Sequence, residues 1–400
     1  MSSLKSFFII LLVMCLPLSG CWDRWELNEL SLIVGMAIDK DEDEYILTMQ
    51  AMNPAEIASQ ETGRGYAQAM NVQERSKTIH ESLRKMVQKS PRRAFISQLK
   101  VLIISEEVAK DGLEKVLDFF YRDHESRSDY YIVISYDNKA SDVLDIITPL
   151  ENLPSQNAFD SITFSLRSYG GTKAVTIDEL YQELMAEGIE PSIMGITVSG
   201  DLKKGRTKAN AEVNSPLSML HISKTALFKE NKLVGWLGQK DSKGLDYLTH
   251  DVSDSVGSFT CPGGGQIALE VKDVQRQLKT NIDNDQPKAT YKFEIEATIS
   301  EVDCTTLNLA LPSSYKKVEQ LASDEFKLTL NSTIEKVKEL NTDVFGIGQN
   351  IYRNHPGFWE AHKEEWDELF KETEIDVEVN IQLTDSGSIV NSFLKVGDQK

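Results

Sequence analysis

The chain has 400 residues, with 62 acidic side chains against 43 basic ones and a formal net charge of −19. So acidic a protein is repelled by nucleic-acid phosphates and by anionic lipid head groups, which excludes nucleic-acid binding and purely electrostatic attachment to a membrane. Hydrophobic residues make up 40% and charged residues 26%, as in an ordinary globular protein. The length suggests two or three domains.

The amino-terminal segment has the pattern of an export signal. An apolar run, Phe7–Leu18, follows one basic residue, Lys5. It is shorter than the ~20 residues of a spanning helix and within the ~7–15 residues of a signal-peptide core. Leu18-Ser19-Gly20-Cys21 then resembles the lipobox of bacterial lipoproteins, which implies cleavage before Cys21 and a diacylglyceryl group on its thiol. The alternative is a plain secretory signal followed by a chance cysteine.

Lipidation at Cys21 would explain how so acidic a body reaches a membrane. One acyl chain gives marginal binding, whereas two give stable anchoring. Trp22 would then lie at the membrane interface, where the tryptophan ring is favoured because it is apolar but carries a polar N–H. We expect Trp25 to pack on the folded body.

Four cysteines occur in the chain, and two of them are explained by the amino-terminal signal. Cys15 leaves with the signal peptide and Cys21 carries the lipid. Cys261 and Cys304 remain. Outside the cytoplasm they form either a disulfide or two separate buried thiols, and the sequence leaves both alternatives open.

Strand and helix patterns alternate through the first half of the chain, which predicts an α/β region. Two apolar runs around an acidic turn predict a hairpin, and the segment after Asn53-Pro54 predicts a loop. A helical face is predicted through Val72, Ser76, Ile79, Leu83 and Met86 or Val87. The remaining predicted elements are strands at 94–105 and 130–135 and helices at 106–123, 138–148 and 176–191, the last with a capping box from Thr176 to Glu179.

Strand patterns dominate the next part of the chain, after a polar linker or exposed loop at 200–214. Hairpin turns are predicted at Glu230-Asn231 and at Gly263–Gly265. A helix-rich block at 314–371 and two closing strands, 374–383 and 387–396, complete the chain. The predicted fold class is therefore α/β (mixed α+β), with about three domains whose mixed sheets are flanked by helices. The predicted division is 1–20 (signal peptide), 21–190 (α/β), 191–285 (β-rich) and 286–400 (α/β).

Trp359 and Trp366, seven residues apart, share a face with Leu369 or Phe370. Such a stripe indicates an amphipathic helix that covers a sheet. The alternative is an aromatic surface for a partner.

Catalytic motifs are missing from the sequence. Gly263–Gly265 precedes a strand pattern rather than a helix, so it is not a phosphate loop. His355 and His362 are separated by Pro356 and lack a second close ligand pair, which argues against a metal site. Neither G-x-S-x-G nor H-E-x-x-H occurs. We therefore predict no catalytic residue, no metal and no cofactor.

Several stretches in order along the chain resemble the Ger(x)C lipoproteins, which are C subunits of nutrient germinant receptors in endospore-forming bacteria. The resemblance covers Cys21 to about Val390. The stretches that carry it are "GCWDRWELNEL", "VGMAIDKDEDEYILTMQAMNPAE", "SPRRAFISQLKVLIISEEVAKDGLEKVLDFFYRD", "TPLENLP", "LFKENKLVGWLGQKDSKGLDYL", "TCPGGGQIALEV" and "NTDVFGIGQNIYRNHPGFW".

This resemblance implies a protein without catalysis of its own, made of three α/β domains. It would be lipid-anchored at Cys21 to the outer face of the spore inner membrane. Its partners would be integral membrane A and B subunits, with which it helps spores respond to small nutrients. Two rivals are a solute-binding lipoprotein of an importer, which should show two similar parallel-sheet lobes, and a lipid-anchored hydrolase.

Overall fold

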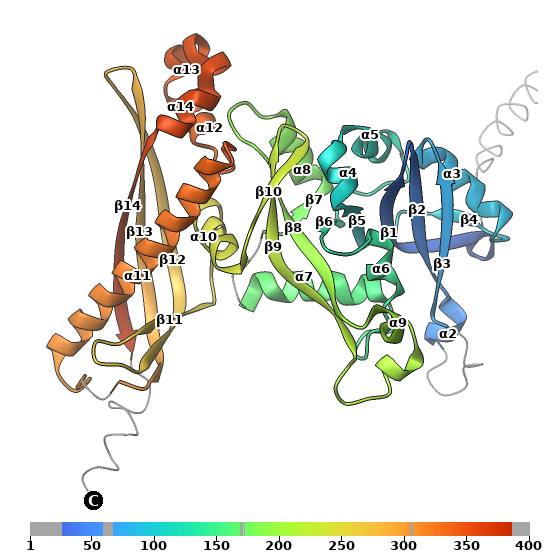
Figure 1. The fold of residues 1–400 in the computed structure, drawn as a ribbon, viewed down its shortest axis with the longest axis horizontal. Helices are drawn as coiled ribbons and strands as arrows, with labels where there is room; N and C mark the ends of the chain where they lie inside the picture. Colours follow the sequence, from blue (N-terminus) through green and yellow to red (C-terminus); the bar gives the residue numbers. More distant parts are fainter. Residues whose placement is uncertain (1–25, 59–66, 169–170, 172, 305–306, 386–400) are drawn as a thin grey trace, which may run out of the picture.

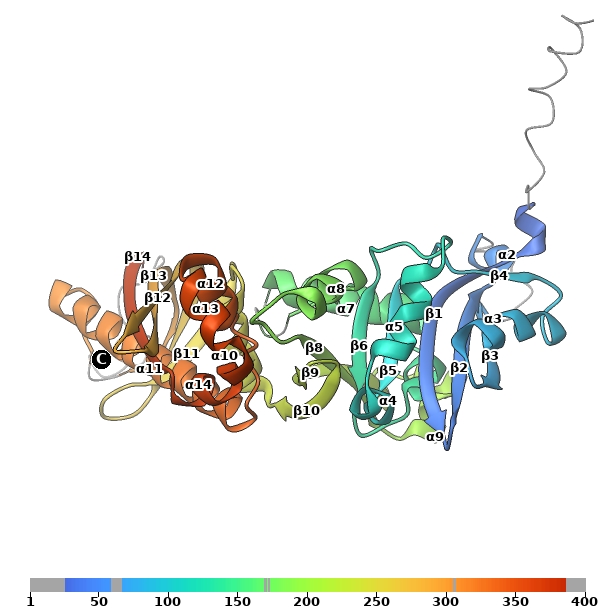
Figure 2. The same ribbon diagram turned by 90° about the horizontal axis from the view of Figure 1, so that it is seen from above.

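The computed structural model describes residues 26–58, 67–168, 171, 173–304 and 307–385. They form two mixed sheets with flanking helices, side by side along the long axis of the molecule (Figures 1 and 2). The predicted multi-domain fold of mixed α and β structure is confirmed. The predicted signal peptide and the predicted strand at 387–396 lie outside the described residues.

The first sheet has the strand order β10-β9-β8-β6-β5-β1-β2-β3, with β4 beside β1 and β7 beside β6. Neighbours run parallel from β8 through β6 and β5 to β1, and the outer pairs are antiparallel. The strands are β1 (Leu30–Asp41), β2 (Glu44–Met52), β3 (Ala69–Ser76), β4 (Arg93–Phe95), β5 (Val101–Ser105), β6 (Tyr131–Ser135), β7 (Val175–Thr176), β8 (Ser192–Gly200), β9 (Ser218–Lys229) and β10 (Lys232–Leu237).

Helices cover both faces of this sheet, α3, α4, α5 and α8 on one and α6 and α7 on the other (Figure 1). All five residues of the central strand β5 are buried, as a parallel strand between two helical layers requires. The helices are α2 (Pro54–Ala58), α3 (Ile79–Lys85), α4 (Glu106–Asp111), α5 (Glu114–Arg122), α6 (Ala140–Asp145), α7 (Pro154–Ser168), α8 (Ile177–Met185) and α9 (Leu202–Gly205), with the 3-10 turns η2 (Leu27–Glu29), η3 (Met86–Gln88) and η4 (Lys208–Asn210).

Side chains of the sheet hold both ends of α6. The buried carboxylate of Asp39 accepts the backbone N–H groups of Ala140 at 2.8 Å and Ser141 at 3.0 Å. At the other end the amides of Gln50 and Asn71 donate to the carbonyl of Leu144. A six-residue helix is marginal on its own, so these contacts fix its place on the sheet.

The second sheet has the order β11-β12-β13-β14, with β13 and β14 parallel and the other pairs antiparallel. Buried and exposed residues alternate along β13, because the helical block covers one face only. The strands are β11 (Ser255–Thr260), β12 (Gln266–Asp283), β13 (Gln286–Val302) and β14 (Glu374–Asp385). The helices are α10 (Gln239–Thr249), α11 (Pro312–Glu339), α12 (Ile347–Asn354), α13 (Pro356–His362), η5 (Lys363–Glu365) and α14 (Trp366–Glu372).

The helical face predicted through Val72 and Ser76 is wrong, since both residues belong to strand β3. In β3 every second residue is buried (Val72, Glu74 and Ser76), which is the period of a strand, and the helix begins only at Ile79. The helix predicted at 106–123 is divided at Gly112, whose φ of +121° no helix allows. The strand predicted at 94–105 is likewise divided into β4 and β5.

Several local predictions are confirmed. The capping box from Thr176 to Glu179 opens α8. The hairpin at Glu230-Asn231 joins β9 to β10, and Gly263–Gly265, all at positive φ, join β11 to β12. The polar segment 200–214 is no plain loop, since it contains α9 and η4.

The predicted domain boundaries can be placed on the two sheets. Residues 191–285 supply β8, β9 and β10 to the first sheet and β11 and β12 to the second. The boundary at 285/286 falls in the turn between β12 and β13, which pair along their length. Sheet membership does not by itself assign folding units, so the division into three domains stays a prediction.

Cys261 and Cys304 are joined as a disulfide, with their Cα atoms 6.0 Å apart, within the usual range for such bonds. The bridge ties the turn after β11 to the segment after β13, and both cysteines are buried.

Since the two cysteines are 43 residues apart in sequence, we expect Cys304→Ser to lower the free energy of unfolding by about 2–4 kcal/mol under oxidising conditions. Urea unfolding with and without dithiothreitol measures this. Reductant should bring the parent close to the variant; a parent whose stability ignores reductant would show that the two thiols are separate.

Candidate functional site

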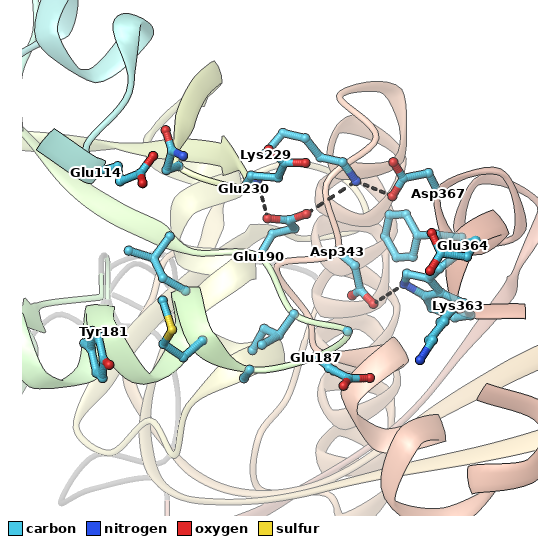
Figure 3. Close-up of a pocket in the computed structure, with 18 of the residues that line it drawn as sticks. Glu114, Tyr181, Glu187, Glu190, Lys229, Glu230, Asp343, Lys363, Glu364 and Asp367 are labelled. Carbon is cyan, nitrogen blue, oxygen red and sulfur yellow. Dashed lines mark hydrogen bonds and ion pairs between the residues drawn. The ribbon is translucent and has the colours of Figure 1, made fainter. Parts of the chain in front are cut away.

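A groove of about 740 Å³ lies where the helices of the first sheet face the helical block of the second (Figure 3). Segments far apart in the chain meet there. The lining residues are Glu114, Leu117, Asp118, Tyr121, Tyr181, Leu184, Met185, Ala186, Glu187, Gly188, Ile189, Glu190, Lys229, Glu230, Asn231, Asp343, Trp359, Lys363, Glu364, Trp366, Asp367 and Phe370.

We call the first sheet with its helices the first half, and the second sheet with helices α10 to α14 the second half. The loop between α8 and β8 lies at the joint, where the two halves make contact. The carbonyl of Gly188 accepts the N–H of Gln349 at 2.7 Å, and the N–H of Glu190 donates to the carbonyl of Asp343 at 2.9 Å. Gly188 has φ +74°, and a Cβ there would lie 2.4 Å from the carbonyl carbon of Gly348. Only glycine allows this backbone contact.

Asp343 is buried at the centre of the joint. Its carboxylate accepts the backbone N–H groups of Ile347 at 3.1 Å and Gly348 at 2.7 Å, which open helix α12. The indole N–H of Trp366 donates to the same carboxylate at 3.1 Å. Burial raises the pKa of Asp343 to about 6, because the loss of water outweighs these donors.

Lys229 connects the halves by ion pairs. Its Nζ lies 3.4 Å from Oε1 of Glu190 and also pairs with Asp367 of α14 (Figure 3). Glu190 further accepts the backbone N–H of Glu230 at 2.6 Å, and burial raises the pKa of its carboxyl above the ordinary value. The ion pair between Lys229 and Asp367 joins the two halves, and the contacts of Glu190 hold Lys229 and Glu230 in place beside it.

The groove is acidic with an apolar wall. Two lysines line it, Lys229 and Lys363, against eight carboxylates: Glu114, Asp118, Glu187, Glu190, Glu230, Asp343, Glu364 and Asp367. Tyr181 and Met185 on α8 keep 45% and 67% of their surface exposed. The arrangement can attract and hold cations that also carry apolar surface.

The residues that the sequence singled out fall into two groups, those outside the described residues and those in the core of the second half. Cys21, Trp22 and Trp25 lie outside the described residues. Trp359, Trp366 and Phe370 are buried in the core of the second half, as the amphipathic interpretation predicts, although α13, η5 and α14 divide the expected single helix.

The two histidines contact different backbone carbonyls. His355 contacts the carbonyl of Thr280 at 3.1 Å, and His362 contacts that of Phe358 at 3.0 Å. In the described part of the chain no three His, Cys, Asp or Glu side chains are arranged to hold a metal ion. No described helix is both long and apolar enough to cross a membrane.

Sequence reasoning missed Gly188, Glu190, Lys229 and Asp343. Asp343 left only a weak signal, because it accepts N–H groups at the start of α12 from three residues before the N-cap position, Gly346, where a capping side chain is normally sought. The other three left none, because their partners lie far away in the chain.

Two family models match the chain in order. "Spore germination protein N-terminal domain" matches residues 23–198, and "Spore germination B3/ GerAC like, C-terminal" matches residues 223–387. The chain belongs to the Ger(x)C family. Spore germination protein KC of Bacillus subtilis (strain 168) is 29% identical over 95% of both chains. Spore germination protein B3 of the same organism is 25% identical, over 96% of this chain and 98% of its own.

A solved structure shares the fold. The crystal structure of the GerBC protein aligns with a TM-score of 0.53 at 20% sequence identity, over 88% of this chain and 97% of that one.

We expect Trp366→Ala to destabilise the second half of this Ger(x)C protein by about 3–5 kcal/mol, because it removes a buried ring and a donor to Asp343. The matched control is Phe164→Ala on α7, where the ring is 62% exposed and the change should stay within about 0.5 kcal/mol. Thermal melting compares them; equal melting of the Trp366 variant and the parent would contradict burial.

The raised pKa of Asp343 predicts a pH dependence of stability. An unfolded aspartate titrates near 3.9, so the native state binds this proton more tightly. The free energy of unfolding should therefore fall as pH rises from about 4 to 6, by up to about 3 kcal/mol from this group, and level off above. Urea unfolding of the parent and of Asp343→Asn tests this: the difference in stability between them should change over that range, and a constant difference would contradict it.

Proposed function

We propose that the protein is the lipid-anchored, non-catalytic C subunit of a nutrient germinant receptor and acts with integral membrane A and B subunits. The observation that carries the proposal is the match of both family models, in order, over nearly the whole chain. The relatives are named for spore germination, and none of the names quoted describes a catalysed reaction.

The two sheets argue against the importer alternative. A solute-binding lipoprotein should have two similar parallel-sheet lobes. Here the first sheet has ten strands covered on both faces, whereas the second has four mostly antiparallel strands covered on one face. The groove between the halves also carries an excess of carboxylates from both halves rather than balanced charges.

Attachment through Cys21 supplies the membrane location. The lipobox resemblance supports a diacylglyceryl group on its thiol, and Trp22 would lie beside it at head-group depth. The first described strand begins at Leu30, so few residues separate anchor and body. A short tether would keep the body near membrane partners at the outer face of the spore inner membrane.

The test is purification of a tagged protein from detergent-solubilised spore membranes. We expect two integral membrane proteins to co-purify, and an amino-terminal peptide that begins at an acylated Cys21. Cys21→Ala should lose acylation and most membrane association, since it removes the only thiol at the cleavage site. Cys15→Ala, within the signal, is the control and should behave as the parent.

Two results would contradict the proposal. An unmodified Cys21 in the mature protein would exclude the anchor. Purification of the parent without any integral partner, together with stoichiometric micromolar binding of an amino acid or sugar by calorimetry, would favour the solute-binding alternative.

A further inference from the structure

Helix α8 has two apolar faces. Ile177 and Leu180 pack into the core of the first half, as expected of a helix on a sheet. The outward residues Tyr181 and Met185, one turn apart, are apolar as well and stay exposed in the described structure, with Leu184 half-buried beside them. The outer face of such a helix is normally polar, so this face is suited to a contact.

The charges around this face select the kind of contact. Exposed carboxylates stand on both sides of the groove, Glu114 on α5 and Glu364 in η5 (Figure 3). The two lining lysines are already paired, Lys229 with Glu190 and Asp367, and Lys363 with Glu360 at 2.9 Å. The remaining field is negative, so an occupant with positive charge is attracted and one with negative charge is repelled.

We propose that the groove binds a lysine- or arginine-rich amphipathic segment of a protein partner, with its apolar side chains on Tyr181 and Met185 and its cations on Glu114 and Glu364. The proposal rests on the proposed function, in which the partner is an integral membrane subunit. A helix laid into a groove by apolar contacts at helical spacing is a common mode of peptide recognition.

The size of the groove and the spread of its carboxylates favour a polypeptide over a small cation as the occupant. A groove of about 740 Å³ with carboxylates on two separate walls offers several contacts to one extended occupant. The described carboxylates do not gather into a metal-binding set. A segment in this position would contact both halves at once, next to the joint at Gly188 and Asp343.

The test uses the full-length protein in detergent and fluorescence anisotropy of synthetic peptides. The probe is an amphipathic peptide of lysine and leucine at helical spacing, compared with a lysine–serine peptide and a glutamate–leucine peptide. We expect only the lysine–leucine peptide to bind well, with an affinity that falls as salt rises. Glu114→Gln with Glu364→Gln should weaken it about tenfold or more, and Met185→Ser severalfold.

Matched controls remove the same charge and apolar surface elsewhere. Glu335→Gln with Glu368→Gln changes two exposed carboxylates outside the groove, and Leu328→Ser changes a side chain that is 63% exposed on α11. These controls should change affinity by less than about twofold. A photo-crosslinking residue at position 185 should label with the lysine–leucine peptide, and one at position 328 should not. Equal losses in groove and control variants, or equal labelling, would overturn the proposal.

Three further outcomes have defined meanings. If the lysine–serine peptide or spermidine binds as tightly as the lysine–leucine peptide, the groove recognises small cations or charge alone and the proposal fails. If the integral partners co-purify equally with the parent and the groove variants, docking lies elsewhere while the receptor assignment stands. Groove-specific peptide binding without any co-purified integral protein would instead support the groove and contradict the receptor assignment.

Discussion

Buried Asp343 is the residue at which contacts within the second half meet a contact with the first half. It holds the start of α12, receives the indole N–H of Trp366, and its backbone carbonyl accepts the N–H of Glu190 from the other half. A carboxylate without water is costly unless donors surround it, so these groups must keep their places together. These contacts hold one wall of the groove in place, since Asp343 and Trp366 both line it beside the loop at Gly188.

The two halves differ in construction. The first sheet is covered on both faces, whereas the second shows one face to solvent. The core of the second half also includes Leu227 of β9 and Leu237 of β10, the two strands at one end of the first sheet. Apolar packing and the polar contacts of Asp343 and Lys229 therefore reinforce one another across the joint.

Local signals in the sequence were enough for most elements but not for the site. The capping box at Thr176 and the turn at Glu230-Asn231 depend on neighbouring residues, and both were predicted. Residues 72–76 were assigned to a helix because Val72 and Ser76 are spaced as on one helical face, although pairing with β2 stabilises a strand there. The groove combines segments separated by more than two hundred residues, and no local pattern reports such a meeting.

Gly188 and Gly348 approach each other so closely that a mutation at either position can only add volume to the joint. A Cβ on Gly348 would lie 2.7 Å from the indole nitrogen of Trp366 and 2.9 Å from the carbonyl oxygen of Gly188. Every substitution at position 348 adds volume to a closely packed contact, so a larger side chain must displace its neighbours further. A series from alanine through serine to valine at position 348 would add increasing volume between Trp366 and the loop at Gly188, and would introduce no charged side chain.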